Sequence, residues 1–430
     1  MARKMKDSGI EWIGEIPEGW EVVPVRSCFD EVRTKNTDGQ EQNALQFKSG
    51  NIISKANFNA NTDDYVADTI TNYTVVLPDT VMINGLNLNY DFKSLRVALV
   101  KEKGVITSAY LAIFPDRKKI SPQYATYLFK GYETKMAFHN MGAGIRKTLG
   151  YKEFKNQPLL LPSKEEQNKI SAYLDSKCSH IDTMLFRTRS GIEEYKKLKQ
   201  AVITQAVTKG VRGEREMKDS GNPWFGQIPA DWKLSRVGLH FSVILGKMLC
   251  NAPLNDTYTL EPYYCAADVH FDGVADGERK KMWFSPVEKE LYRVSVGDLL
   301  VVEGGAGAGG SAIVEHQDSD TYIQNSIMIV RSKGSADNRY LRYLLEFLVK
   351  QGYIDIVCNK ATIPHFTKDK LSCVPFCLCP TGEQKEIADY LDAKCTEIDG
   401  LIAKKELLVK ELESYKKSLI YEVVTGKREV

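Results

Sequence analysis

The sequence predicts an α+β protein built as a tandem repeat, in which two mixed α/β domains are joined by two long helices that pair as an intramolecular coiled coil. Three observations carry this prediction: a helical segment occurs twice, a short head segment occurs twice, and the stretches between them scarcely match. A fixed internal period identifies a repeat architecture before secondary structure is considered.

The helical segment reads EEQNKISAYLDSKCSHIDTM from Glu165 and GEQKEIADYLDAKCTEIDGL from Gly382. Its shared residues keep one displacement, as when Gln167 corresponds to Gln384, 217 positions later. Both copies place apolar residues every three or four positions, which predicts an apolar seam along one side of a helix. The seam residues are Ile170, Leu174, Cys178, Ile181, Leu185, Ile192, Tyr195 and Val202 in the first copy, and Ile387, Leu391, Cys395, Ile398, Ile402, Val409, Leu412 and Leu419 in the second.

A helix of about 40 residues is a rod of roughly 60 Å, and a lone rod cannot bury its seam. One seam position is polar in both copies, Thr188 and Lys405, so the two surfaces match even in their gap. We therefore expect the two helices to pack on each other. The alternative is that each helix packs on its own globular domain.

The head segment runs from Met5 to Trp20 and returns from Met217 to Trp232, 212 positions later. The second domain is therefore about five residues longer than the first. The repeat divides the chain into a first head and domain (1–163), a first helix (164–211), a second head and domain (212–380) and a second helix (381–430). Two equivalent frames thus carry two different domains.

Short strands are expected where β-branched residues alternate between turn-forming residues. In the first domain they are Val22–Val25, Val75–Leu77, Val81–Ile83, Val97–Val100, Tyr110–Phe114 and Pro158–Pro162, with a helix at Gln123–His139. In the second they are Leu299–Val302, Ser311–Val314, Ser326–Val330 and Cys373–Cys379, with a helix at Asn338–Gln351.

Composition sets broad limits on the 430-residue chain. Its hydrophobic content of 43 % is ordinary for a globular protein, Met1–Ile10 lacks the apolar core of a signal peptide, and no run approaches the ~18 apolar residues of a membrane span. Nine irregularly spaced cysteines fit reduced thiols. We expect a cytoplasmic protein without membrane contact, and the net charge of +2 argues against a pervasive polyanion-binding surface while leaving room for basic patches.

Three patterns suggest chemistry, and each has a simpler interpretation. Gly305–Gly310 matches GxGxxG, but a strand-like sequence follows it where a dinucleotide fold needs a helix. Asp79, Asp91 and Lys93 resemble the two carboxylates and the lysine of a metal-dependent nuclease motif. A turn at Asp79 and a solvated strand edge at Asp91 and Lys93 explain these residues equally well.

Zinc ligation is the third pattern, because Cys373, Cys377, Cys379 and His365 lie close in sequence. The cysteines alternate with apolar residues in a strand, so buried thiols are the better interpretation and no metal site is expected. A methyltransferase Asn/Asp-Pro-Pro-Tyr/Phe tetrapeptide, a Walker A loop and a Ser/His/Asp or Cys/His set are all missing from the sequence. The chain therefore reads as a binding or organising protein; a self-sufficient nuclease and a structural adaptor are the alternatives.

Polar loops in both domains have the side chains that read base edges, since Asn and Gln pair with adenine and Arg and Lys with guanine. Local Lys and Arg clusters also suit phosphate contacts. The candidates are Asn84, Asn87, Asn89, Tyr90, Lys93, Arg96, His139, Arg146 and Lys147 in the first domain, and Gln324, Asn325, Lys360, Thr362, His365 and Lys368 in the second.

The repeated heads, the Pro…Glu-Gln helix entry and the Tyr-Leu-Asp-x-Lys…Ile-Asp helices resemble the specificity subunits of type I restriction–modification systems, over essentially the whole chain. The resemblance implies two target-recognition domains, each reading one half of a bipartite asymmetric site in double-stranded DNA. It also implies an antiparallel helical spacer with pseudo-twofold symmetry, which sets the half-site distance and helps recruit two adenine-N6 methyltransferase subunits and the restriction (translocase–nuclease) subunits. This chain would itself bind no cofactor, while the partner subunits use S-adenosylmethionine, ATP and Mg²⁺.

Overall fold

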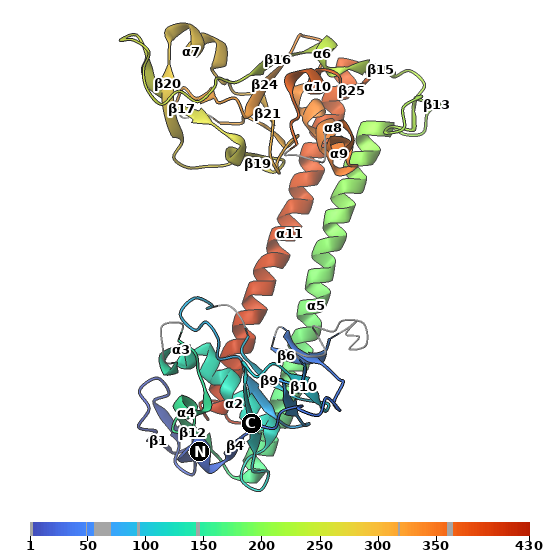
Figure 1. The fold of residues 1–430 in the computed structure, drawn as a ribbon. Coiled ribbons are helices and arrows are strands. Elements are labelled where there is room, and N and C mark those ends of the chain that lie inside the picture. Colours follow the sequence, from blue (N-terminus) through green and yellow to red (C-terminus); the bar gives the residue numbers. More distant parts are fainter. Residues whose placement is uncertain are drawn as a thin grey trace. The chain divides into compact units, whose positions relative to one another are not determined.

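The computed structural model describes residues 3–48, 50–55, 70–92, 95–142, 147–316, 319–358 and 364–430. The chain forms two compact units (Figure 1): unit 1 comprises Met1–Arg189 and Glu406–Val430, and unit 2 comprises Ser190–Lys405. Each unit therefore contains one head, one globular domain and a stretch of both long helices. Among the described residues, no helix combines the length and apolarity needed to cross a membrane.

Unit 1 is built on a four-stranded antiparallel sheet in the order β4-β11-β8-β9. These strands are β4 (Phe29–Glu31), β11 (Leu111–Pro115), β8 (Val81–Ile83) and β9 (Val97–Leu99). The helices α2 (Pro122–Thr134), α3 (Ala137–Met141) and α4 (Tyr151–Phe154) follow in sequence. Successive strand residues point to opposite faces, so Val81 and Ile83 pack with α2 while Met82 packs in a smaller cluster on the other face.

Two-stranded ribbons complete unit 1. The head is a hairpin of β1 (Met5–Asp7) and β2 (Glu15–Pro17), and β3 (Glu21–Pro24) pairs with the exit strand β12 (Pro158–Leu161). The other ribbons pair β5 (Leu45–Lys48) with β6 (Asn51–Ser54), and β7 (Thr74–Val76) with β10 (Gly104–Ile106); a short 3-10 turn, η1 (Val25–Ser27), follows β3.

Unit 2 repeats this plan, although the two domains scarcely match in sequence. Its sheet has the order β16-β24-β21-β22, with β16 (Phe241–Leu245), β24 (Ile327–Ser332), β21 (Leu299–Val302) and β22 (Ser311–Ile313). The head hairpin is β13 (Met217–Asp219) and β14 (Gln227–Pro229), and β15 (Lys233–Arg236) pairs with the exit strand β25 (Pro375–Leu378). Its helices are α6 (Val237–His240), α7 (Pro286–Tyr292), α8 (Asn338–Lys350), α9 (Tyr353–Val357) and α10 (Lys368–Ser372).

Unit 2 also carries a second sheet. Its order is β20-β17-β23, with β20 (Lys280–Phe284), β17 (Thr259–Tyr264) and β23 (Tyr322–Ile323), the last pair being parallel. A short ribbon joins β18 (Val269–His270) to β19 (Gly273–Val274) after the 3-10 turn η2 (Ala266–Asp268).

The two long helices are α5 (Lys164–Lys209) and α11 (Thr381–Val424), and they run antiparallel side by side within each unit (Figure 1). In unit 1, Lys416 contacts Asp182 at 2.6 Å, and Arg189 pairs with Glu413. Partner numbers fall along α11 as they rise along α5, which is the antiparallel pattern. The coiled-coil prediction is therefore confirmed.

In unit 2 the same antiparallel pairing continues. Lys199 contacts Asp399 at 2.6 Å, and the amine of Lys405 lies 5.6 Å from the ring centre of Tyr195. Lys405, the polar member of the second seam, thus packs over an aromatic ring of the first.

Most seam residues are buried, and the rest are half-buried. The buried ones are Ile170, Leu174, Cys178, Ile181, Leu185, Ile192, Ile387, Leu391, Cys395, Ile398 and Leu419, and the half-buried ones are Tyr195, Val202, Ile402, Val409 and Leu412. The core of unit 1 takes in the start of α5 and also the end of α11, so packing on a domain and packing on the other helix occur together.

The expected strands are present with shifts of one or two residues, but two details were wrong. The helix expected over Gln123–His139 stops at Thr134, because Met136 has left-handed backbone (φ 52°) and separates α2 from α3. The exit strand expected over Cys373–Cys379 begins only at Pro375, since Cys373 caps the short helix α10.

Candidate nucleic-acid interface

The Glu-Gln dipeptide at the start of α5 holds two neighbouring parts of unit 1. Glu166 accepts a hydrogen bond of 2.9 Å from the indole of Trp20 in the head, and it pairs with Arg3. Gln167 accepts a bond of 2.7 Å from the backbone N–H of Ser121, the N-cap residue of α2. One dipeptide thus fixes both the head and the domain helix to the long helix.

Unit 2 repeats these contacts with Glu383 and Gln384. Glu383 accepts a bond of 3.3 Å from the indole of Trp232 and pairs with Arg215. Gln384 accepts a bond of 3.0 Å from the backbone N–H of Asp337, the N-cap of α8.

A tyrosine in each domain helix adds a third attachment to the frame. The hydroxyl of Tyr127 donates to Asp175 of α5 at 2.7 Å, and the hydroxyl of Tyr343 donates to Asp392 of α11 at 2.7 Å. Burial is the largest cause that raises the pKa of both tyrosines, followed by these hydrogen bonds to carboxylates. In each unit the domain is therefore held in a defined orientation on the helix that follows it.

The first candidate site is the loop that leaves β8, and Arg96 lies inside it. Arg96 is 1 % exposed, and its guanidinium donates to the backbone carbonyls of Asn84 and Leu86, each at 2.9 Å, and to that of Asp91. The ring nitrogen Nε2 of His139 lies 3.1 Å from the same Asp91 carbonyl. Arg96 therefore shapes the loop from within and does not present its guanidinium to a ligand.

A second segment lies against this loop. The backbone N–H of Leu88 donates to the carbonyl of Lys147 at 3.2 Å, and that of Leu149 donates to the carbonyl of Gly85 at 2.9 Å. A Cβ on Gly85 would lie 2.4 Å from the Leu149 carbonyl oxygen, so the close approach requires glycine.

The structure thus brings most of the first-domain candidates into one place. They are Asn84, Asn87, Asn89, Tyr90, Arg96, His139 and Lys147, while Lys93 and Arg146 lie outside the described residues. Phe92 also belongs to this group, although no sequence pattern marks it as a base-reading residue: the centre of its ring lies 5.1 Å from that of His139, and the two rings are stacked with 12° between their planes.

The second candidate site is the loop that leaves β21, the strand that occupies the same place in its sheet as β8. Glu303 donates its backbone N–H to the carbonyl of Ser326 at 2.8 Å and accepts from the N–H of Phe366 at 2.6 Å. The imidazole Nδ1 of His365 lies 3.4 Å from the Glu303 carboxylate. The segment before the exit strand therefore lies against the β21 loop, as Leu149 lies against Gly85 in unit 1.

Gln324 and Asn325 directly precede Ser326, whose carbonyl accepts the Glu303 N–H. The side-chain amide of Gln324 donates to the side-chain oxygen of Asn325 at 2.6 Å. The backbone N–H of Asn325 donates to the backbone carbonyl of Lys247 at 2.8 Å. Lys368 begins α10 and is exposed, whereas Lys360 and Thr362 lie outside the described residues. Glu303 and Lys247 also lie here, although neither was a sequence-based candidate. The only sequence feature that could have indicated Glu303 is its place directly after a buried strand, which Asn84 shares.

The three alternative chemistries have local structural explanations. Asp79 lies 2.7 Å from Arg117, and Asp91 lies 3.7 Å from Arg96, so an arginine is close to each carboxylate of the nuclease-like pattern, whose Lys93 lies outside the described residues. Gly305–Gly310 joins β21 to β22, which confirms the expected strand after the glycines.

The cysteines of the zinc-like pattern separate from one another. Cys377 and Cys379 are buried in and beside β25, where burial raises the pKa of both thiols, to about 12 for Cys379; Cys373 is exposed. Within the described ranges, no three His, Cys, Asp or Glu side chains gather closely enough to hold a metal ion.

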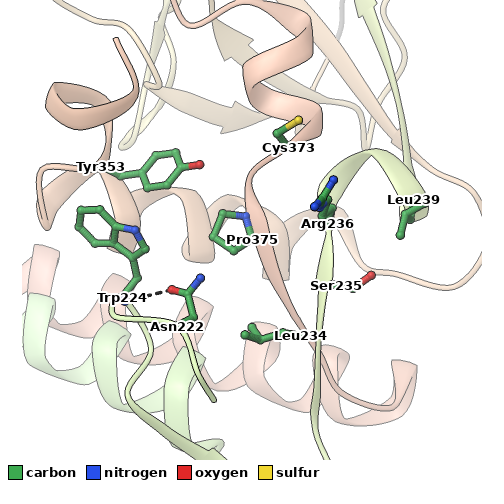
Figure 2. Close-up of a pocket in the computed structure, with 9 residues that line it drawn as sticks. All are labelled: Asn222, Trp224, Leu234, Ser235, Arg236, Leu239, Tyr353, Cys373 and Pro375. Atoms are coloured by element: carbon green, nitrogen blue, oxygen red, sulfur yellow. Dashed lines mark hydrogen bonds between the residues drawn. The ribbon is translucent and has the colours of Figure 1, made fainter. Parts of the chain in front are cut away.

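A cleft of about 650 Å³ lies in unit 2 between the head and the β15–β25 ribbon (Figure 2). Trp224 and Tyr353 line it with their rings 5.4 Å apart, edge to face, and Arg236 and Cys373 also line it. The side-chain oxygen of Asn222 accepts a bond of 3.0 Å from the backbone N–H of Trp224, which holds the head turn. None of the base-reading candidates lines this cleft, so it is separate from the second site.

Comparisons with known proteins point to one kind of protein. A family model described as "Type I restriction modification DNA specificity domain" matches residues 257–409. The chain is similar to two proteins of Methanocaldococcus jannaschii. One is a putative type I restriction enzyme MjaX specificity subunit, 26 % identical over 96 % of this chain and 95 % of the relative; the other is a type I restriction enzyme MjaVIII specificity subunit, 24 % identical over 96 % and 93 %.

Solved structures share the fold. A chain from a structure of a type I R-M system, described for its complex assembly and conformational transition, matches with a TM-score of 0.69 at 17 % identity, covering 96 % of this chain and 99 % of that chain. The HsdS subunit from Thermoanaerobacter tengcongensis matches with a TM-score of 0.53 at 16 % identity, covering 96 % and 98 %.

Proposed function

Because the chain belongs to the specificity subunits of type I restriction–modification systems, we propose that it selects the DNA sequence on which such a complex acts. Each domain reads one half of a bipartite, asymmetric site. The paired helices set the distance between the half-sites and recruit the other subunits.

One observation carries this proposal. The candidate loops leave β8 and β21, which hold the same place in two sheets of the same order, and each loop lies against the segment before its exit strand. The side chains at the two sites differ: Asn87 and Tyr90 follow β8 in unit 1, whereas Gln324 precedes β24 and His365 precedes the exit strand in unit 2. Corresponding sites with unlike side chains are what two readers of unlike sequences need.

The catalytic steps are assigned to partner subunits. Two methyltransferase subunits would use S-adenosylmethionine, and restriction subunits would use ATP and Mg²⁺, while this chain contributes no catalytic group and binds no cofactor. The arginine partners of Asp79 and Asp91 support this assignment over a nuclease within the chain. Purified chain incubated with plasmid and Mg²⁺ should leave the DNA intact.

The decisive experiment maps methylated adenines made by the complex of the full chain with its methyltransferase subunits. Asn87→Ala should relax the sequence requirement in one half of the site only, and His365→Ala should relax the other half only. A Leu77→Ala variant, at an exposed residue of unit 1 that lies on neither long helix and outside the β8 loop, is the control and should keep the wild-type site. If both loop variants altered the same half, the assignment of one half-site to each domain would be wrong.

A further inference from the structure

The β8 loop of unit 1 carries two large aromatic side chains on its outside. Tyr90 is 73 % exposed and Phe92 is 56 % exposed. Single exposed apolar residues are common on protein surfaces, but two exposed aromatic side chains within three residues of one loop form a small apolar patch that a ligand can contact. Asn87 lies beside them, also exposed and with left-handed backbone (φ 54°).

Hydrogen bonds to buried groups hold this loop in place. Arg96 donates to three carbonyls of the loop, and its own backbone N–H donates to Glu133 of α2. The backbone N–H groups of Tyr90 and Asp91 both donate to the carbonyl of Asn87, at 3.1 and 3.0 Å, which closes the turn. A preformed loop loses little conformational freedom on binding, so an aromatic ring on it binds at low entropic cost.

The two rings have different surroundings. Phe92 stacks on His139, so one of its faces is already covered. Tyr90 is the more exposed of the two, and its neighbours in the turn are the uncharged Asn87 and Asn89. A flat ring beside the exposed amide of Asn87 suits the face and edge of a nucleobase, because stacking needs only a π-surface while the amide can bond to a base edge.

We infer that Tyr90 enters the DNA at the first half-site and stacks between adjacent bases, so that the first domain reads its sequence partly through the ease of unstacking one base step. Apolar wedges of this kind open and kink flexible steps, and the deformation energy depends on the sequence deformed. This inference rests on the proposed function and adds to it the way in which one domain reads. Arg96 then acts as a positioning residue for the wedge.

Local base unstacking can be measured with 2-aminopurine. The complex of the full chain with its methyltransferase subunits is bound to duplexes carrying the mapped site, with 2-aminopurine at successive positions of the first half-site. The target adenine is left unlabelled, because a methyltransferase flips it in any case. With wild-type chain, the emission should rise on binding at one step.

Tyr90→Ala should abolish that rise and weaken binding by about 10- to 100-fold, the usual range for a lost base–aromatic stack. The dependence of binding on salt should stay unchanged, since no phosphate contact is lost. Tyr90→Phe keeps the ring and should retain both the rise and the affinity. Leu77→Ala, at an exposed residue of unit 1 outside the β8 loop and the long helices, is the control and should behave as wild type.

Three results would overturn the wedge: no emission change at any position, a change that persists in Tyr90→Ala, or loss of methyltransferase subunits from the Tyr90→Ala complex, which would mean that the ring docks a protein. The proposed function fails separately, if the wild-type complex binds all sequences alike.

Discussion

The indole of Trp20 donates a hydrogen bond of 2.9 Å to Glu166, and this contact ties the first head to the start of α5. Trp232 and Glu383 repeat it in unit 2 at 3.3 Å. The two copies differ in burial, because the side chain of Glu166 is 25 % exposed and that of Glu383 is 0 % exposed.

Removing Glu383 should therefore destabilise the protein more than removing Glu166. Glu383→Ala leaves the Trp232 N–H and the Arg215 guanidinium without their buried acceptor, which costs about 3 kcal/mol. Glu166→Ala should cost about 1 kcal/mol, because water can reach the vacated site. Urea unfolding of the full chain, followed by tryptophan fluorescence, measures both; equal losses would show that burial does not set the difference.

Glu133 should make stability depend on pH. Burial raises the pKa of this carboxyl to about 7, against the opposing effect of the Arg96 N–H and of Lys130, Arg96 and Lys417. Between the ordinary value of 4.5 and about 7, the folded protein holds a proton that the unfolded chain releases. The free energy of unfolding should thus fall as pH rises through this window, by on the order of 2–3 kcal/mol.

Glu133→Gln removes this ionisation while keeping an acceptor for the Arg96 N–H. The variant should be more stable than wild type at pH 8 and differ little at pH 4.5. Glu165→Gln, at an exposed helix position, is the control. Urea unfolding curves at the two pH values provide the measurement, and parallel losses in wild type and Glu133→Gln would rule out Glu133 as the cause.

The helices should act as a ruler for the recognised site. An insertion of four residues next to Thr188, with a matching insertion next to Lys405, adds about one turn, or roughly 6 Å, to each helix. That length corresponds to between one and two base pairs, so the gap between the half-sites should lengthen accordingly. Mapping methylated adenines from the variant complex tests this, and an unchanged gap would refute the ruler.

A fragment ending near Gly213 should dimerise. It keeps the first head, domain and helix but loses Leu419 and Val423 of α11, which are buried in the core of unit 1. The matching residues of α5, Val202 and Ala206, pack in the core of unit 2, so α5 of a second copy can supply the missing contact.

With its methyltransferase, the dimer should modify a symmetric site. Light scattering gives the oligomeric state, and Ala206→Asp should shift it toward the monomer. A well-folded fragment that stays monomeric without that substitution would contradict the paired-helix explanation.

The heads and the long helices were predictable from the sequence because each occurs twice in similar form. The repeated Glu-Gln and Tyr-Leu-Asp motifs located α5 and α11, and the 3-4 spacing of apolar residues predicted their pairing. The roles of Glu166 and Gln167 were not predictable, because a hydrogen bond to a head or to an N-cap leaves no periodic signal.

The candidate sites were harder to predict than the frame. The polar composition of the loops identified Asn87, Tyr90 and His139 as base-reading candidates. It also included Arg96, which is buried and hydrogen-bonds to the loop backbone. Glu303 was missed because a single acidic residue after a strand has no distinguishing pattern, and only the sheet order shows that it corresponds to Asn84.

The doubled Glu-Gln attachment has a consequence for how new variants of this protein can arise. Each domain is attached to the long helix that follows it through the N-cap residue and one tyrosine of its domain helix, α2 or α8. These attachment points lie outside the candidate loops. These anchoring residues occur in both halves of the chain at matching places. A different domain that ends in the same residues would therefore keep both attachments, and a domain could be exchanged as a whole without altering the helix that carries it.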